Sequence, residues 1–303
     1  LLKKEILLKV IGYERVYILL SGGLDSRITL LAYTALLEDE NIPVPICVTW
    51  GLENSKDVQY AKRITEILGY DWVYLPLEPY NLLYNIDNEF RSTYGLVSPV
   101  HYHRMDWFKN IDKASLVIAS SYGDSIGRGV FSGEHITEVR NIKARNYLNL
   151  LNKAKAEIAI TKSKEEINKF EQFDDPSGRK EIMYQGIYMR NMISQAMSVI
   201  DQYCDLYQVF THPMVYSFIW SLDKYLRNNG IYYQILNSVY PVLKDIPWSK
   251  NKKKVLDNDT KYLNSFHNYS HWISNELFDD IIDRIDMKYL ASLEVFNLKN
   301  INK

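Results

Sequence analysis

One stretch of this sequence reads Val16-Tyr17-Ile18-Leu19-Leu20-Ser21-Gly22-Gly23-Leu24-Asp25-Ser26-Arg27. Its apolar run up to Leu20 is rich in β-formers and predicts a short buried strand. From Leu24 onward, apolar side chains recur at helical spacing as far as Leu36, which predicts a helix. Only Ser-Gly-Gly separates the two. The stretch therefore predicts a strand that turns sharply into a helix, the building unit of an α/β fold.

The turn carries groups suited to phosphate. Two glycines allow the backbone to turn tightly and to approach a ligand without Cβ atoms in the way. The following helix would present free N–H groups and partial positive charge, which favour anions. Asp25 would repel a phosphate directly, but its carboxylate suits Mg²⁺ that bridges to phosphate oxygens. The alternative is an ordinary strand-to-helix turn, in which Asp25 is a first-turn residue favoured by the helix dipole.

Strand and helix signals alternate through the first half of the chain. Further strands are predicted at 43–50, 72–77 and 115–120, and a helix capped by Asn54 or Ser55 ends near Gly69. We therefore predict a doubly wound parallel α/β sheet of the adenine nucleotide alpha hydrolase type, with a helical C-terminal half. The expected parts are an α/β core at 1–140 and a mostly helical part at 141–303, including one or two exposed helices within 142–173.

Composition narrows the class of protein. The net charge is −1, with 36 basic and 37 acidic residues, which argues against a broadly basic nucleic-acid surface. The two cysteines, Cys47 and Cys204, cannot form a disulfide framework, which fits a reducing compartment such as the cytoplasm. No apolar run reaches the ~20 residues of a membrane span. We expect a protein that binds neither nucleic acid nor membranes.

The segment from Ser21 to Ser26 resembles the pyrophosphate-binding loop of the ATP pyrophosphatases, most closely that of the asparagine and β-lactam synthetases. The resemblance covers roughly residues 1–254 and is specific at three segments. The second, Trp50 to Asp57, is similar to that family's Gly-Leu-x-x-Ser-x-Asp stretch. The third, Ala119 to Ser125, follows the fourth predicted strand and aligns on Asp124.

The resemblance implies that ATP and Mg²⁺ are cofactors. Asp25 and Asp124 would hold Mg²⁺ on the pyrophosphate leaving group, and Trp50 stands where the family holds adenine through its backbone. The resemblance implies an ATP-dependent synthetase that adenylates a small-molecule carboxylate and then transfers ammonia or an amine. The residues implied to contact ATP are Leu20, Ser21, Gly22, Gly23, Leu24, Asp25, Ser26, Trp50, Ala119 and Ser120.

The sequence departs from the family at several places. It has no glutaminase segment before the loop, so ammonia would come from solution or from a separate glutaminase partner. Ser121 or Tyr122 and Ser125 replace acidic residues, which makes aspartate an unexpected substrate. Tyr122 resembles the tyrosine of the β-lactam synthetases' proton-transfer pair. Lys250 is our candidate for the family's late catalytic lysine; the alternatives are Lys252, Lys253 and Lys254, or a merely solvated loop.

Other interpretations remain open at this point. A diverged nucleotide-binding protein without catalysis would also keep the loop. Another ATP pyrophosphatase chemistry, such as tRNA thiolation or NAD synthesis, is less favoured, because thiolation usually calls for catalytic cysteines and a basic surface. His101 and His103 lie two residues apart but lack a cluster of metal ligands around them. Arg190 faces either the cleft, as the resemblance implies, or the surface.

Overall fold

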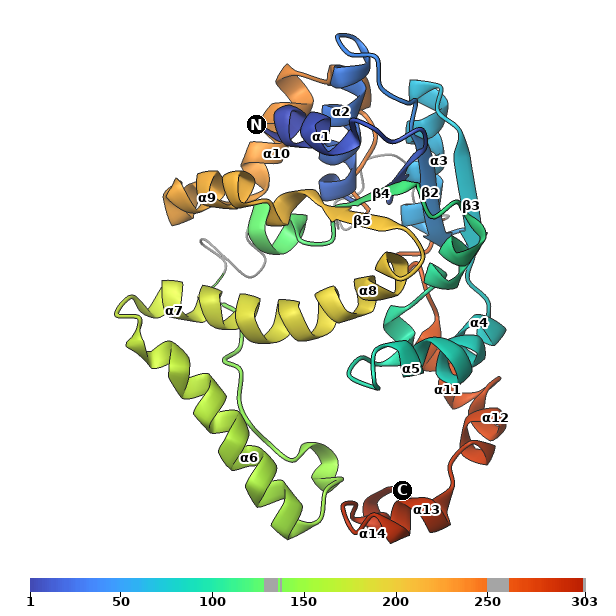
Figure 1. Cartoon of the computed structure of the whole chain (residues 1–303), viewed down its shortest axis with the longest axis vertical. Helices are drawn as coiled ribbons and strands as arrows, with labels where there is room; N and C mark the ends of the chain where they lie inside the picture. Colours follow the sequence, from blue (N-terminus) through green and yellow to red (C-terminus); the bar gives the residue numbers. More distant parts are fainter. Residues whose placement is uncertain (128–135, 137, 250–261, 302–303) are drawn as a thin grey trace.

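The computed structural model describes residues 1–127, 136, 138–249 and 262–301. Its centre is one five-stranded, all-parallel sheet with the strand order β3-β2-β1-β4-β5 (Figure 1). The register places Ile18 of β1 opposite Cys47 of β2 and Ile118 of β4. The strands are β1 (Val16–Leu19), β2 (Ile46–Gly51), β3 (Trp72–Pro76), β4 (Leu116–Ala119) and β5 (Asp205–Gln208).

Helices occupy most of the rest of the described chain. The α-helices are α1 (Leu2–Val10), α2 (Leu24–Leu37), α3 (Lys56–Leu68), α4 (Pro79–Tyr84), α5 (Phe90–Ser92), α6 (Lys153–Asn168), α7 (Pro176–Met183), α8 (Gln195–Asp201), α9 (Pro213–Ser221), α10 (Asn229–Ser238), α11 (Tyr269–Ser274), α12 (Phe278–Asp283), α13 (Met287–Ser292) and α14 (Leu298–Ile301). The π-helical segments are η1 (Asn85–Glu89), η4 (Gly123–Gly127) and η8 (Tyr184–Ser194). The 3₁₀ segments are η2 (Pro99–His101), η3 (Met105–Asn110), η6 (Tyr147–Asn149), η7 (Lys169–Gln172), η9 (Val209–Thr211), η10 (Lys224–Leu226) and η11 (Pro241–Leu243).

Local signals set the helix ends beside the sheet. The Ser55 side chain accepts a hydrogen bond from the backbone N–H of Val58 and so caps α3. Gly69 ends α3 in the left-handed conformation at φ +71°, which glycine adopts without steric cost. Both ends agree with the expectation from the sequence, as does the start of α2 directly after Gly23.

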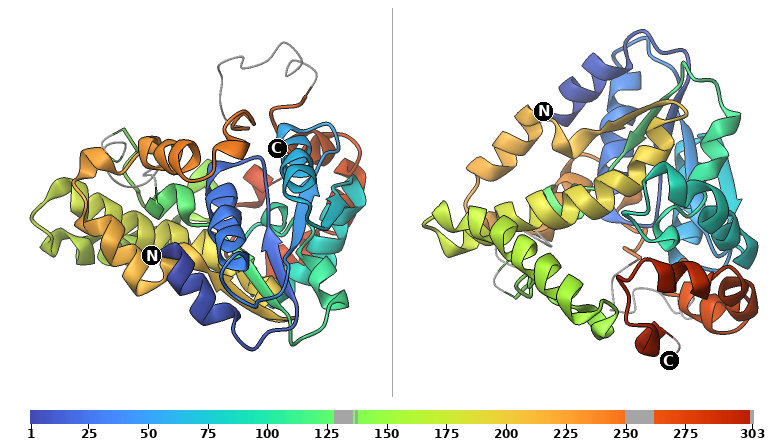
Figure 2. Two further views of the ribbon diagram at one scale, coloured as in Figure 1. Left: turned by 90° about the horizontal axis from the view of Figure 1, so that it is seen from above. Right: turned by 60° about the horizontal axis from the view of Figure 1, so that its bottom comes forward.

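Apolar clusters lie on both faces of the sheet. On one face, Ile18 of β1 packs in a cluster with Leu31 of α2 and Ile64 of α3. On the other face, Tyr17 of β1 packs with Phe108 of η3 and Met197 of α8. A continuous helical run leads from α7 through η8 to α8, and its α8 end packs on this second face (Figures 1 and 2). Alternation of side chains along β1 therefore supplies both halves of the core.

Strand β5 is the element that the sequence analysis missed. It lies in the half expected to be mostly helical and pairs in parallel with β4, with Ala119 opposite Gln208. Its four residues, Asp-Leu-Tyr-Gln, contain no buried residue and no continuous apolar run, because it is an edge strand of the sheet. The larger apolar cluster also includes Val215 of α9 and Leu236 of α10. The core is thus built from both halves of the chain.

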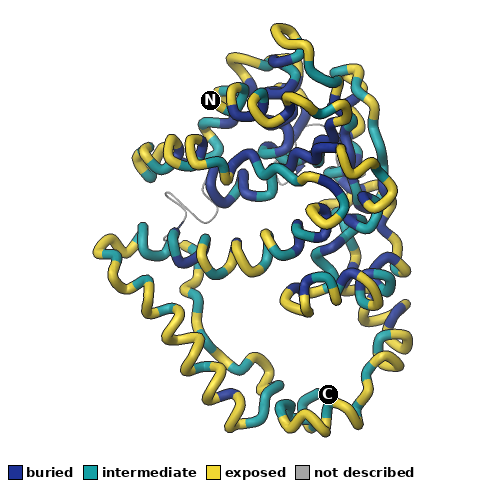
Figure 3. The backbone as a smooth tube through the Cα atoms, in the orientation of Figure 1, coloured by how far each residue is buried: buried dark blue, intermediate teal, exposed yellow. Residues whose placement is uncertain are grey.

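The outer helices are less buried (Figure 3). Helix α6, which lies within the exposed helical region expected at 142–173, buries only Ala156 among its residues. Below the sheet, the C-terminal residues return to the start of α6: Asn152 N–H donates to the Val295 carbonyl at 2.9 Å, and Asn297 N–H to the Leu150 carbonyl at 2.8 Å. No described helix combines the length and apolar character needed to cross a membrane.

Candidate active site

A cavity of about 740 Å³ opens at the carboxyl ends of β1, β2 and β4. This edge is where ligands commonly bind to parallel sheets, because strand ends there deliver loops from several crossovers to one place. The structure brings together most of the predicted ATP and metal residues. Those that line the cavity are Leu20, Ser21, Gly23, Asp25, Ser26, Trp50, Ser120 and Asp124.

Three predicted contact residues lie behind the cavity wall. Leu24 is 1% exposed and Ala119 is fully buried, each within an apolar cluster. Gly22 packs against the start of α3, where a Cβ atom would lie 2.9 Å from the Lys56 carbonyl oxygen. None of these three residues is among those that line the cavity.

The loop between β1 and α2 is closed by its own serines. Ser26 Oγ accepts a hydrogen bond from Ser21 N–H at 3.1 Å, and Ser21 Oγ accepts one from Gly23 N–H at 3.1 Å. The N-cap of α2 is Gly23, which has no side chain to cap this 14-residue helix. The start of α2 therefore meets the cavity without a cap from its own N-cap residue, an arrangement that favours an anion.

The loop after β4 packs directly against Asp25. A Cβ atom added to Gly123 would lie 2.5 Å from Asp25 Cβ and 2.6 Å from its Oδ1, so only glycine permits this approach. The next residue, Asp124, lines the same cavity, and its Oδ1 accepts a hydrogen bond from Ser125 Oγ at 3.0 Å. Two carboxylates from the ends of neighbouring strands thus share one cavity.

Asp57 is a third cavity carboxylate, to which the sequence analysis assigned no role. It stands in the first turn of α3 and accepts a hydrogen bond from Ser249 Oγ at 2.9 Å. Its sequence signal was its place as the last residue of the Trp50–Asp57 segment, which resembles the family's Gly-Leu-x-x-Ser-x-Asp stretch. Among the described residues, no group of three or more His, Cys, Asp and Glu side chains forms a complete metal site. A divalent cation held by Asp25 and Asp124 would need ligands from a bound phosphate.

Arg27 joins the loop to a segment more than two hundred positions later. Its guanidinium is 1% exposed and donates hydrogen bonds to the carbonyls of Ile246 at 2.7 Å and Pro247 at 2.9 Å. Burial lowers the pKa of Arg27 to about 10, which leaves it protonated at neutral pH. Ser249 N–H also donates to the Gly22 carbonyl at 3.1 Å. These bonds hold the turn whose residues Trp248 and Ser249 line the cavity.

Of the two predicted catalytic residues, Tyr122 alone belongs to the described part of the chain. Tyr122 is 7% exposed and lines a second cavity of about 280 Å³, together with Gln185, Ser194 and Arg190, whose placement the sequence left open. Burial raises the Tyr122 pKa, and a hydrogen bond with Ser194 partly opposes the shift. Tyr122 is not among the residues lining the larger cavity. Lys250 lies outside the described residues, as do Lys252, Lys253 and Lys254.

The remaining wall of the larger cavity is apolar and aromatic. Met105, Met192 and Met197 contribute apolar surface, and the Trp50 ring stacks on the ring of His103. The segment before α11 adds residues Asn264 to Phe266, because the Leu52 N–H donates to the Phe266 carbonyl at 2.8 Å. This part of the cavity wall could not be predicted from the sequence, because residues 264–266 carry no motif.

No protein-family model matches this chain, and no curated protein matches it either. Any function for the chain therefore rests on the residues of the cavity and on the resemblance of three short segments.

Proposed function

We propose that this chain is an ATP-dependent, amide-forming synthetase, similar to the asparagine synthetases. The proposed reaction adenylates a small-molecule carboxylate and then transfers ammonia or an amine, whether free or delivered by a glutaminase partner. The proposed fold is the doubly wound adenine nucleotide alpha hydrolase type. The strand order β3-β2-β1-β4-β5 and the helices on both faces of the sheet support it.

One observation carries the proposal. Asp25 and Asp124 come from different strand ends and line one cavity, next to a loop whose following helix has no side-chain cap. Carboxylates that face an anion-binding helix terminus suit a phosphate chain with a bound Mg²⁺. The donor set therefore fits Mg²⁺ and a polyphosphate better than it fits an anion alone.

The residues suggest how such a reaction would be organised. The substrate carboxylate would attack the α-phosphorus of ATP, and the bond from that phosphorus to the bridging oxygen would break to release pyrophosphate. The loop serines and the first turn of α2 would orient the departing phosphates, while Asp25 and Asp124 would hold the cation. Mg²⁺ supplies charge neutralisation of the leaving group. The amine would then displace AMP from the acyl group.

ATP–pyrophosphate exchange with a panel of carboxylic acids and Mg²⁺ tests this proposal. We expect exchange with at least one acid, and Asp25→Asn to lower it roughly 100-fold, because a charge that neutralises the leaving group is lost. Asp39→Ala is the matched control, since that exposed aspartate pairs with Lys3 on the surface and does not line the cavity. Equal exchange in wild type and Asp25→Asn would overturn the proposal.

Binding measurements distinguish the proposed synthetase from a non-catalytic nucleotide-binding protein. Calorimetric titration with ATP and Mg²⁺ would show binding that weakens in Asp25→Asn if the cavity takes the nucleotide. Binding without exchange for every acid and amine tried would contradict the synthetase and support a diverged nucleotide-binding protein. The Ser125 hydroxyl bound to Asp124 stands where the family has a second acid, and this alternative draws on that difference.

A further inference from the structure

The segment from His101 to Arg104, here called the histidine loop, forms one side of the larger cavity. The proposed function leaves this loop without a role. His103 follows η2 and lines the cavity beside Trp50. Its backbone has φ +47°, a left-handed conformation that is uncommon for residues other than glycine. Such conformations persist where the surrounding structure imposes them, and they concentrate at functional sites.

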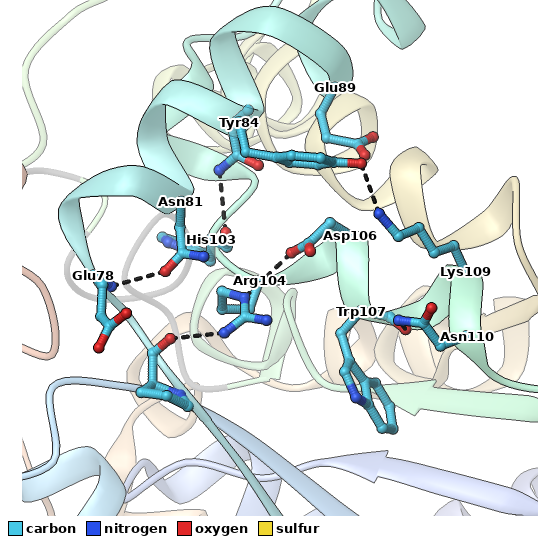
Figure 4. Close-up of polar contacts among 12 residues, drawn as sticks. Glu78, Asn81, Tyr84, Glu89, His103, Arg104, Asp106, Trp107, Lys109 and Asn110 are labelled. Atoms are coloured by element: carbon cyan, nitrogen blue, oxygen red, sulfur yellow. Dashed lines mark hydrogen bonds and ion pairs between the residues drawn. The ribbon is translucent and has the colours of Figure 1, made fainter.

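The surrounding structure does impose this conformation (Figure 4). Asn85, which is fully buried, donates from Nδ2 to the His103 carbonyl at 3.1 Å. The next residue, Arg104, donates from its guanidinium to the Pro76 carbonyl at 2.9 Å and to Asp106 at 3.3 Å. The loop is thus tied to η1 and to the end of β3, which holds the His103 ring in one place.

The ring of His103 is surrounded by aromatic side chains. It stacks on Trp50 with ring centroids 5.8 Å apart and an interplanar angle of 26°. It meets Phe266 edge-on at 5.1 Å and lies at 5.8 Å from Tyr269 with an angle of 18°. These residues come from three distant parts of the chain, so the cluster exists only in the folded protein.

Burial decides the protonation state of this ring. Burial, with smaller contributions from the neighbouring His101 and His267, lowers the pKa of His103 to about 3, so the imidazole is neutral near pH 7. Nδ1 lies 2.9 Å from the Tyr269 hydroxyl. Burial also raises the pKa of Tyr269, which keeps the phenol protonated. Among the described residues, the Tyr269 hydroxyl has no other hydrogen-bond acceptor, so we assign it as the donor to Nδ1, which places the imidazole proton on Nε2.

Tyr269 is not among the cavity-lining residues, whereas His103 is. Because Nδ1 is engaged with Tyr269, Nε2 is the ring nitrogen that is left to bond a ligand. This nitrogen is a neutral hydrogen-bond donor beside a stacked indole, at the end of β2. A planar heteroaromatic group with a ring-nitrogen acceptor matches both features.

We propose that His103 is a specificity-determining residue for adenine, with Nε2–H donating to the N1 acceptor of the base beside Trp50. This inference rests on the proposed function, because it assumes that the cavity takes a nucleotide. Hypoxanthine and guanine carry a hydrogen on N1, so they would set two donors against each other. A site built to donate one hydrogen bond rejects such a base strongly. Tyr269 is the positioning residue that fixes the tautomer.

Calorimetric titration of the full chain, with Mg²⁺, tests the proposal with three nucleotides. ATP and purine riboside triphosphate both offer an N1 acceptor, whereas inosine triphosphate does not. We expect the first two to bind at least about 10-fold more tightly than the third in wild type. His103→Phe keeps an aromatic ring but removes the donor, so the preference should fall to about one. Tyr269→Phe removes one hydroxyl and should reduce the preference partly.

Two controls separate the possible outcomes. His271→Phe changes an exposed histidine of α11 and should keep the full preference. Inorganic pyrophosphate with Mg²⁺ should bind wild type and His103→Phe equally, because the loop at Ser21–Ser26 is unchanged. Retention of the preference in His103→Phe, or its absence in wild type, would overturn the base-recognition role and leave the proposed function standing. Failure of wild type to bind ATP and pyrophosphate would overturn both.

Discussion

At the scale of single residues, Arg27 shows how a buried charge can organise a site without touching a ligand. The guanidinium bonds to backbone carbonyls rather than to a described carboxylate, at Ile246 and Pro247 on one side and at Gly22, 3.3 Å away, on the other. A planar fork of donors suits several carbonyls at once, which a lysine ammonium cannot match. Arg27 thereby fixes the turn that ends with the cavity residues Trp248 and Ser249.

Replacing Arg27 should destabilise the protein. Arg27→Met would leave buried carbonyls without donors, and we expect the free energy of unfolding in urea to fall by about 2–4 kcal/mol. Arg27→Lys should lie between this variant and wild type. The control is Arg63→Met on the exposed side of α3. If Arg27→Met unfolds at the same urea concentration as Arg63→Met, the guanidinium does not hold the turn.

At the scale of elements, short-range signals were predictable and edge pairing was not. The Ser55 cap, the Gly69 stop and the strand-to-helix turn at Gly22-Gly23 each depend on residues within one helical turn. Strand β5 depends instead on β4, because its own four residues lack an apolar pattern. The close approach of Gly123 to Asp25 is also a contact between elements, and local propensity does not encode it.

Substituting Gly123 tests that contact. In Gly123→Ala the new methyl group would lie 2.5 Å from Asp25 Cβ, so the loop after β4 or the Asp25 side chain must move. We expect the unfolding free energy to drop by about 1–3 kcal/mol. Because both proposed Mg²⁺ ligands shift relative to each other, ATP binding with Mg²⁺ should weaken at least 10-fold, to be measured by calorimetry.

Gly12→Ala is the control for the glycine substitution. Gly12 has φ +93°, so an alanine there would be strained, although its Cβ atom would have open space around it. Gly12 lies in the loop between α1 and β1, away from the cavity. The substitution should lower stability while leaving ATP affinity unchanged. Equal ATP affinity in Gly123→Ala and Gly12→Ala would show that the placement of Asp25 relative to Asp124 does not matter for binding.

At the scale of the whole molecule, the cavity depends on segments from the entire chain. The sheet takes β5 from the second half, and the histidine loop packs against the residues around α11. Burial lowers the pKa of His101, His103 and His267, which lie close enough to influence one another. This cluster makes global stability respond to pH.

The direction of that response follows from proton linkage. An unfolded histidine has its ordinary pKa of 6.5, whereas folded His103 binds a proton only near pH 3. Between these values the unfolded chain binds more protons, so stability is full above about pH 6.5 and declines as the pH falls. The free energy of unfolding in urea should be lower at pH 5 than at pH 7.5, and this difference should be smaller in His103→Asn. His271→Asn should show the same difference as wild type. If the two variants lose stability equally between these pH values, the assignment to His103 is contradicted.

The local parts of the site could be predicted from short-range patterns in the chain. The turn at Ser21–Ser26, the start of α2, and strands β1 to β4 follow from propensity, spacing and glycine, all of which act over a few residues. The common placement of Asp25 and Asp124 also followed, because parallel strands deliver their carboxyl ends to one edge. The contacts that complete the cavity wall form between distant segments and became visible in the folded chain. Asp57 with Ser249, Arg27 with Ile246, and His103 with Tyr269 are pairs separated by more than 160 positions, and only the collapse of the core brings them together.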